Sequence, residues 1–168
     1  MKQRHSILNG TASVVLVLVL GACASSTSTG GQTSSLGFTA AQLCALATSA
    51  DVSAALGVSV GSAESGINAP ACIWTGAGGA GATIAATDPS SVGQVPVGMQ
   101  GLDNHGATAV SGLGDAAYFA AAGDIPDAEL DIKKGGKAIT ITVGVSGFTQ
   151  AQQEAAEKAI GVAAVKHF

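Results

Sequence analysis

Hydrophobic and polar residues alternate most clearly near the end of the chain. From Ile139 to Val145, isoleucine and valine occupy every second position, and threonine and glycine lie between them. This period of two predicts a strand over Ala138–Val145 with one buried face. A partner strand is predicted over Leu130–Lys133, because the intervening Lys134–Lys137 segment contains two adjacent glycines and is typical of a tight hairpin turn.

Shorter apolar runs predict four more strands, over Ala71–Thr75, Ala82–Thr87, Ala107–Val110 and Ala116–Ala120. The glycine-rich segment between the first two is interpreted as a hairpin loop. Its Gly76, Gly78 and Gly81 also have the spacing of a dinucleotide-binding fingerprint. That fingerprint needs a helix directly after the glycines to hold the pyrophosphate, whereas a strand is predicted here. A phosphate-binding loop is therefore the weaker interpretation.

Three capping patterns predict the starts of helices. In each of them a threonine is followed three residues later by Gln or Asp: Thr39 with Gln42, Thr48 with Asp51, and Thr149 with Gln152. The middle helix is expected to end at Gly57 and to pack on the sheet through a small apolar face, formed by Val52, Ala55 and Leu56.

The last helix has its own apolar stripe. Ala155, Ala159 and Val162 fall at helical spacing and are expected to form its packing face, and Phe168 is expected to cover its far end. Together the elements predict a single α+β domain over residues 38–168. It has an antiparallel sheet of about five or six strands, with short N-terminal helices and a C-terminal helix packed on it.

The first 22 residues are predicted to be a lipoprotein signal peptide. Lys2 and Arg4 precede a Val and Leu run that is too short to span a bilayer. The tetrad Leu20–Cys23 resembles the bacterial lipobox, in which the cysteine thiol receives diacylglycerol before the signal peptidase cuts in front of it. The resemblance implies that Cys23 is lipidated. An ordinary signal peptide followed by a chance cysteine is the alternative.

Residues 23–37 are predicted to be the lipidated cysteine and a flexible tether, because the segment is rich in Ser, Thr and Gly and shows no apolar period. The full chain has seven basic and eleven acidic residues, a net charge of −4, and the loss of Lys2 and Arg4 with the signal would make it −6. This balance argues against a nucleic-acid partner, which would need many Lys and Arg contacts to phosphates. An acyl anchor needs no basic patch.

Two features of the domain bear on chemistry. Cys44 and Cys72 remain once Cys23 is lipidated, and in an oxidising compartment they are expected to form a disulfide. Two thiols without a nearby histidine are too few ligands for zinc, so no metal or cofactor is expected. The lysines at the hairpin tip, Lys133, Lys134 and Lys137, are interpreted as solubilising rather than as a lipid-headgroup site.

A long segment, Asp88–Asp103, is expected to cross the surface, and surface loops often bind ligands. Met99, Leu102 and His105 are the candidate ligand-binding residues, and a merely solvated histidine is the alternative. A hydrolase could use His105 with Asp103 or Asp115 and with Ser111. No G-x-S-x-G nucleophile motif surrounds Ser111, so an enzyme is not expected.

Three segments in order resemble the actinobacterial lipoprotein family described as domain of unknown function 3558. They are Cys44–Gly57, Cys72–Gly76 and Gly112–Tyr118, and the resemblance extends over residues 38–166. The chain lacks the proline that the family often has where Ser49 stands. The resemblance implies an extracytoplasmic lipoprotein with an α+β domain, and it supplies no catalytic residue.

The sequence therefore predicts a lipoprotein anchored to the outer side of the cell membrane that acts as a binding or interaction module of the cell envelope. Its expected partners are membrane lipid, through acylated Cys23, and an envelope protein, a wall component or an apolar ligand. The alternative is a carrier of a lipid or another small apolar molecule between membrane and wall. Abundant Ala and Gly would leave room for such a ligand beneath the sheet.

Overall fold

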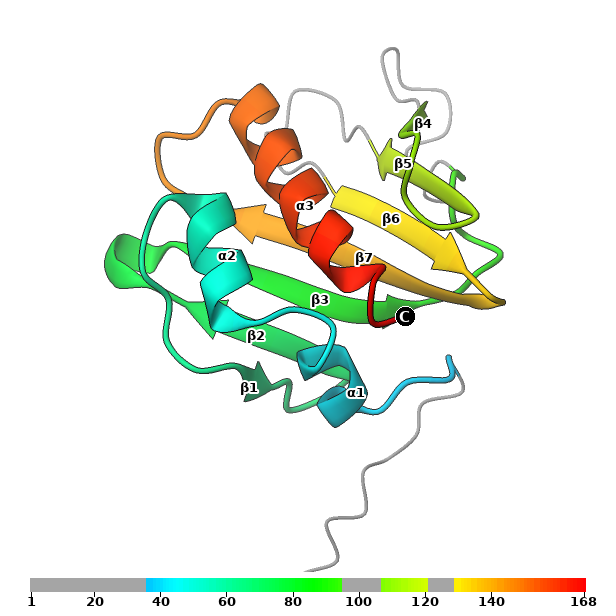
Figure 1. The fold of residues 1–168 in the computed structure, drawn as a ribbon, viewed down its shortest axis with the longest axis horizontal. Coiled ribbons are helices and arrows are strands. Elements are labelled where there is room, and N and C mark those ends of the chain that lie inside the picture. The colour runs from blue at the N-terminus through cyan, green and yellow to red at the C-terminus, as the bar shows by residue number, and fades with distance from the viewer. Residues whose placement is uncertain (1–35, 95–106, 121–128) are drawn as a thin grey trace, which may run out of the picture.

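The structure, a computed structural model, describes residues 36–94, 107–120 and 129–168. Within these residues one antiparallel sheet of seven strands carries α2 (Ser49–Leu56) and α3 (Gln150–Ala164) on one face (Figure 1). The short helix α1 (Ala40–Cys44) packs beside β1 and β2. The α+β class is confirmed.

The sheet has one strand more than the upper limit that the sequence predicted. Its spatial order is β1-β2-β3-β7-β6-β5-β4, and neighbouring strands are antiparallel. The bounds are β1 (Glu64–Ser65), β2 (Ala71–Thr75), β3 (Gly81–Thr87), β4 (Ala107–Ala109), β5 (Ala116–Ala120), β6 (Glu129–Lys134) and β7 (Lys137–Gly144). The additional strand is β1, whose two residues are too few to show an alternating pattern.

The three α-helices of the described residues begin at the predicted capping boxes, and a short 3-10 helix, Ala77–Gly79, lies between β2 and β3. The Thr39 hydroxyl accepts a hydrogen bond from the Gln42 backbone N–H at 3.2 Å, and the Gln42 side chain accepts one from the Thr39 N–H at 2.8 Å. Equivalent reciprocal pairs open α2 at Thr48 and α3 at Thr149. These side chains satisfy N–H groups that have no partner within the helix, which is why the starts could be predicted. Gly57 ends α2 with a φ of +68°.

The packing face of α3 was predicted wrongly. Ala155, Ala159 and Val162 are exposed, and Val162 keeps 43% of its surface accessible. The buried face lies about a third of a turn away and consists of Gln153, Ala156, Glu157, Ile160, Gly161 and Ala164. It contains two polar side chains, so an argument from apolar spacing alone selected the wrong side of an alanine-rich helix.

Two lysines of the hairpin tip, Lys134 and Lys137, make specific contacts. Lys134 Nζ donates a hydrogen bond to the Val165 carbonyl at 2.6 Å, at the C-terminal end of α3. Lys137 Nζ lies 4.8 Å from the centre of the Phe38 ring. Phe38 in turn packs edge-to-face on Phe168, with ring centres 5.4 Å apart. The β6–β7 turn therefore holds both ends of the described domain together.

Candidate functional site

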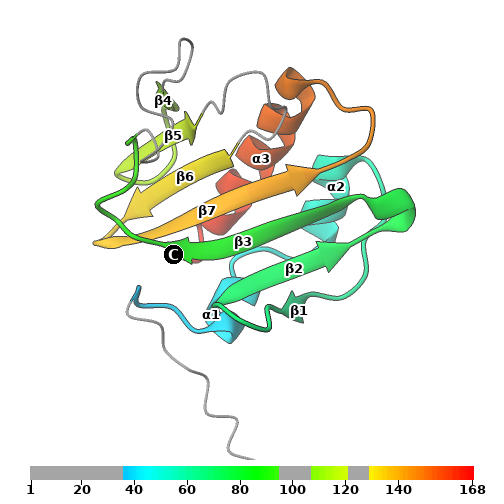
Figure 2. The same cartoon turned by 180° about the vertical axis from the view of Figure 1, so that it is seen from behind.

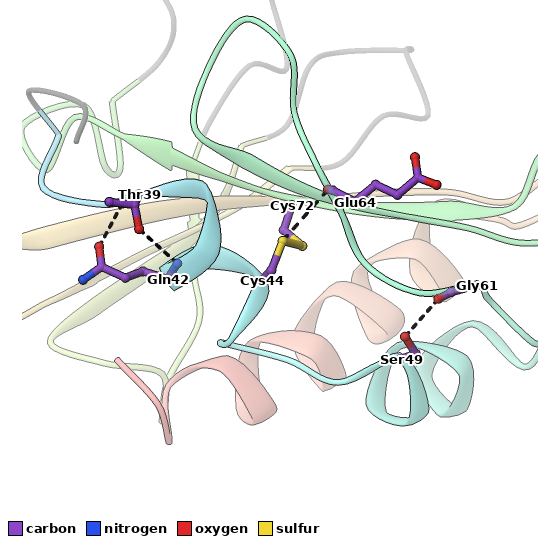
Figure 3. The surroundings of a disulfide bond; sticks show 7 residues. All are labelled: Thr39, Gln42, Cys44, Ser49, Gly61, Glu64 and Cys72. Atoms are coloured by element: carbon purple, nitrogen blue, oxygen red, sulfur yellow. Dashed lines mark hydrogen bonds between the residues drawn. A yellow bond between two sulfur atoms is a disulfide. The ribbon is translucent and has the colours of Figure 1, made fainter. Parts of the chain in front are cut away.

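The disulfide predicted between Cys44 and Cys72 is present. It joins the last residue of α1 to Cys72 of β2, which pairs with Ser65 of β1, and the two Cα atoms are 5.0 Å apart (Figure 3). Nearby, the Ser49 hydroxyl donates a hydrogen bond to the Gly61 carbonyl at 2.9 Å, at the start of α2. These links fasten both short helices to the β1–β2 side of the sheet.

The other predicted site residues lie outside the described residues. They are Cys23, Met99, Leu102 and His105. Of the hydrolase set considered above, Ser111 and Asp115 are described, and the Asp115 carboxylate accepts a hydrogen bond from the Gly135 backbone N–H at 2.8 Å. Asp115 thus fixes the β6–β7 turn. Within the described ranges no three His, Cys, Asp or Glu side chains come together as metal ligands, and no helix has the length and apolarity to cross a membrane.

The sheet face opposite α2 and α3, here called the open face, is the candidate binding surface (Figure 2). Strand side chains alternate between the two faces. Cys72 and Trp74 are buried beneath the helices, whereas Ile73 between them keeps 37% of its surface exposed. Hydroxyl-bearing side chains occupy the neighbouring open-face positions, among them Thr83 opposite Ile73 and Thr142 opposite Thr83.

A shallow hollow of about 240 Å³ lies at one end of the open face. Its lining includes Ile73, Thr75, Thr83, Thr142 and Gly144, together with backbone of the β2–β3 loop. Gly81 and Gly144 pair directly across β3 and β7. Because neither residue has a side chain, the strand backbone forms the floor there. The hollow combines methyl groups with hydroxyls and accessible peptide groups.

A polar row crosses the other half of the open face. The strand register places Tyr118 opposite Asp131, and Asp131 opposite Thr140. The Thr140 hydroxyl donates to Asp131 Oδ1 at 2.6 Å. Burial raises the pKa of the Asp131 carboxyl, and the bond from Thr140 opposes this shift. The row offers a carboxyl, a hydroxyl and a phenol along three adjacent strands.

The segment after β3 lies against this polar row. Gly93 is so close to Tyr118 that an added Cβ would come within 2.8 Å of the ring. Asp88 shapes the start of the segment, since its Oδ1 accepts hydrogen bonds from the Ser90 backbone N–H at 2.8 Å and from the Ser90 hydroxyl at 2.7 Å. These bonds lower the pKa of Asp88. The described part of the predicted surface loop therefore borders the open face.

A second polar group, which was not predicted from the sequence, lies between α3 and the sheet. Glu157 is fully buried, and its Oε1 accepts a hydrogen bond from the Val143 backbone N–H at 3.2 Å. Glu157 Oε2, Gln153 Oε1 and Trp74 Nε1 are buried without a hydrogen-bond partner among the described residues. Desolvation raises the pKa of Glu157 to about 8, and the charges of Glu129 and Glu154 add to the shift.

The side chains of Glu157, Gln153 and Trp74 are at most 6% exposed, so we assign this polar group to the core rather than to the binding surface. Its sequence signal was the spacing of Gln153 and Glu157, four residues apart and in line with Ile160 and Ala164. Because Gln153 and Glu157 are polar, a search for apolar residues at helical spacing does not find this face.

Comparison with known proteins adds no relative. No family model, no curated protein and no solved structure matches this chain. The resemblance to the actinobacterial lipoprotein family thus depends on the quoted motifs alone, and the open face is defined by the geometry of this structure.

Proposed function

We propose that the protein is a membrane-anchored extracytoplasmic lipoprotein whose domain is a binding or interaction module of the cell envelope. The lipobox tetrad ending at Cys23 and the Ser, Thr and Gly tether support the anchor. The Cys44–Cys72 disulfide agrees with an oxidising compartment.

The observation that supports a binding role most strongly is the one-sided cover of the sheet. Both longer helices lie on one face, and the opposite face presents Ile73, a row of threonines and the hollow to solvent. This surface combines apolar contact area with hydroxyls and the partly buried Asp131 carboxyl. Such a surface suits the binding of an envelope protein or a wall component better than it suits catalysis. Among the described residues of this face, Asp131 bonds to a threonine rather than to a second titratable group.

Site-specific photocrosslinking in intact cells tests this role. A photoreactive residue is placed at Thr83 or at Thr142 in the hollow, and a control is placed at Ala159, which is exposed on α3. We expect a defined crosslinked partner from both hollow positions and none from Ala159. Crosslinks no stronger from the hollow than from α3 would contradict the assignment of the open face.

A carrier for a small apolar molecule is the alternative function. The apolar part of the hollow favours it, but about 240 Å³ is below the roughly 300–1,000 Å³ of typical ligand pockets. Native mass spectrometry of the gently purified lipoprotein separates the two functions. A bound apolar molecule released on unfolding would favour the carrier, and ligand-free protein would favour the interaction module.

A further inference from the structure

The most exposed large apolar side chain of the described domain is at the tip of the β1–β2 loop. Ile67 keeps 96% of its surface accessible. The other residues of the loop, Gly66 and Asn68–Pro70, carry no charge. Beyond the loop, Ala71 and Ile73 of β2 continue a mostly apolar strip on the open face.

Hydrogen bonds and a close backbone contact hold the β1–β2 loop in a defined conformation. The Gly66 backbone N–H donates to the Ala71 carbonyl at 2.9 Å, which closes the turn, and the Pro70 carbonyl accepts a hydrogen bond from the Ala86 N–H at 3.2 Å. A Cβ on Gly66 would lie 2.9 Å from the Ala69 carbonyl oxygen. The backbone on both sides of Ile67 is thus fixed, so the side chain is presented at a defined position.

The loop also lies on the side of the domain where the chain enters. It is beside α1 in both views of the fold (Figures 1 and 2), and the Cys44–Cys72 disulfide ties α1 to the strand that follows the loop. The described chain begins at Leu36, four residues before α1, and only 12 residues lie between Leu36 and the predicted lipid-bearing Cys23. The flexible tether predicted from the composition of this segment would have a root-mean-square span of roughly 20 Å.

We propose that the β1–β2 loop contacts the lipid bilayer that holds Cys23, with Ile67 inserted at the interface. This inference rests on the proposed lipoprotein function. The tether keeps the loop within a short distance of the bilayer, so even a weak contact becomes intramolecular and is strongly favoured by effective concentration. An uncharged loop on an acidic protein indicates apolar insertion rather than attraction to anionic headgroups.

Fluorescence quenching by lipids that carry bromine on their acyl chains tests the contact. The acylated full chain is purified from a bacterial host that lipidates it and reconstituted into phosphatidylcholine vesicles that contain the brominated lipid. Ile67→Trp introduces a reporter at the loop tip. Ala77→Trp is the matched control, because Ala77 is also exposed but lies at the opposite end of β2, in the short 3-10 helix Ala77–Gly79. The native Trp74 is fully buried and gives the background.

We expect the emission added by Ile67→Trp to fall roughly twofold or more in brominated vesicles, since interfacial side chains lie about 5–10 Å into the headgroup and acyl boundary. The emission added by Ala77→Trp should not change. Equal quenching of both reporters, or of neither, would overturn the loop contact.

Flotation of the same vesicles separates this inference from the proposed function. If the chain floats with the vesicles and Cys23→Ala abolishes flotation, unquenched Ile67→Trp refutes the loop contact and leaves the lipoprotein intact. The strip would then be open to a protein partner. If the chain does not float, or floats equally without Cys23, the anchored function itself is wrong.

Discussion

The Glu157 carboxyl on α3 accepts a hydrogen bond from the Val143 backbone N–H on β7, and its other oxygen is buried with no partner among the residues that the structure describes. Val143 is one residue beyond the last pairing of β7 with β6, which is Thr142 with Glu129. The Glu157 side chain thus supplies a hydrogen-bond acceptor to β7 at the point where its pairing with β6 ends. This contact fixes the position of α3 on the sheet and places an ionisable group inside the core.

The buried carboxyl predicts a loss of stability as the pH rises. Its pKa is raised from 4.5 to about 8 in the folded state, so the folded protein keeps a proton that the unfolded chain releases between these values. At about 1.4 kcal/mol per pKa unit, the free energy of unfolding should fall by up to roughly 4 kcal/mol from pH 4.5 to 8. Urea unfolding at several pH values measures this slope.

Glu157→Gln should remove most of that slope, because the amide is uncharged at every pH and its oxygen can still accept from Val143. Glu64→Gln, on the exposed strand β1, is the control and should leave the slope as it is in the wild type. The pKa values of Asp51 and Asp88 are lowered from the ordinary 3.8, so these two carboxyls affect stability below this pH window. A slope that is unchanged in Glu157→Gln would show that Glu157 is not the group responsible.

Substitution by alanine should destabilise the protein to different extents at Gly112 and Gly114, two glycines of one turn. Gly112 and Gly114 both have positive φ, +83° and +61°, which disfavours alanine by roughly 1–2 kcal/mol. Space for a Cβ is open at Gly112, whereas at Gly114 it would collide with the Lys133 carbonyl oxygen and lie 3.2 Å from Ile132 Cγ2. The collision is with strand backbone, which cannot move without disturbing the sheet.

Gly114→Ala should therefore destabilise the protein by about 1–3 kcal/mol more than Gly112→Ala does. Thermal or urea unfolding of the two variants measures the difference directly, and each variant serves as the other's control for the backbone penalty. Equal losses would mean that the close approach of this turn to β6 is not a constraint.

Helix starts and most strands could be predicted because their signals are local. A threonine and the residue three positions later are enough to form a capping box, and Gly135 and Gly136 are enough to indicate a hairpin turn. The row of Tyr118, Asp131 and Thr140 could not be predicted, because it arises when β5, β6 and β7 pair in one register. The burial of Glu157 likewise depends on which face of α3 meets the sheet, and alanine lines both faces.

Removal of the Cys44–Cys72 disulfide should lower the free energy of unfolding. It closes a loop with a sequence separation of 28 residues, for which chain entropy gives roughly 3 to 4 kcal/mol. The double variant Cys44→Ser with Cys72→Ala should unfold at correspondingly lower urea concentration. The wild-type protein after reduction provides a second measurement of the same loss. Unchanged stability in both would contradict a structural role for the bond.

The most direct test of the whole account is the mass of the mature N-terminal peptide from a lipidating bacterial host. We predict that the peptide begins at Cys23 and carries the mass of diacylglycerol, and that Cys44 and Cys72 resist alkylation until the protein is reduced. A mature protein that begins elsewhere, or that has an unmodified thiol at Cys23, would contradict the membrane anchor on which the proposed function depends.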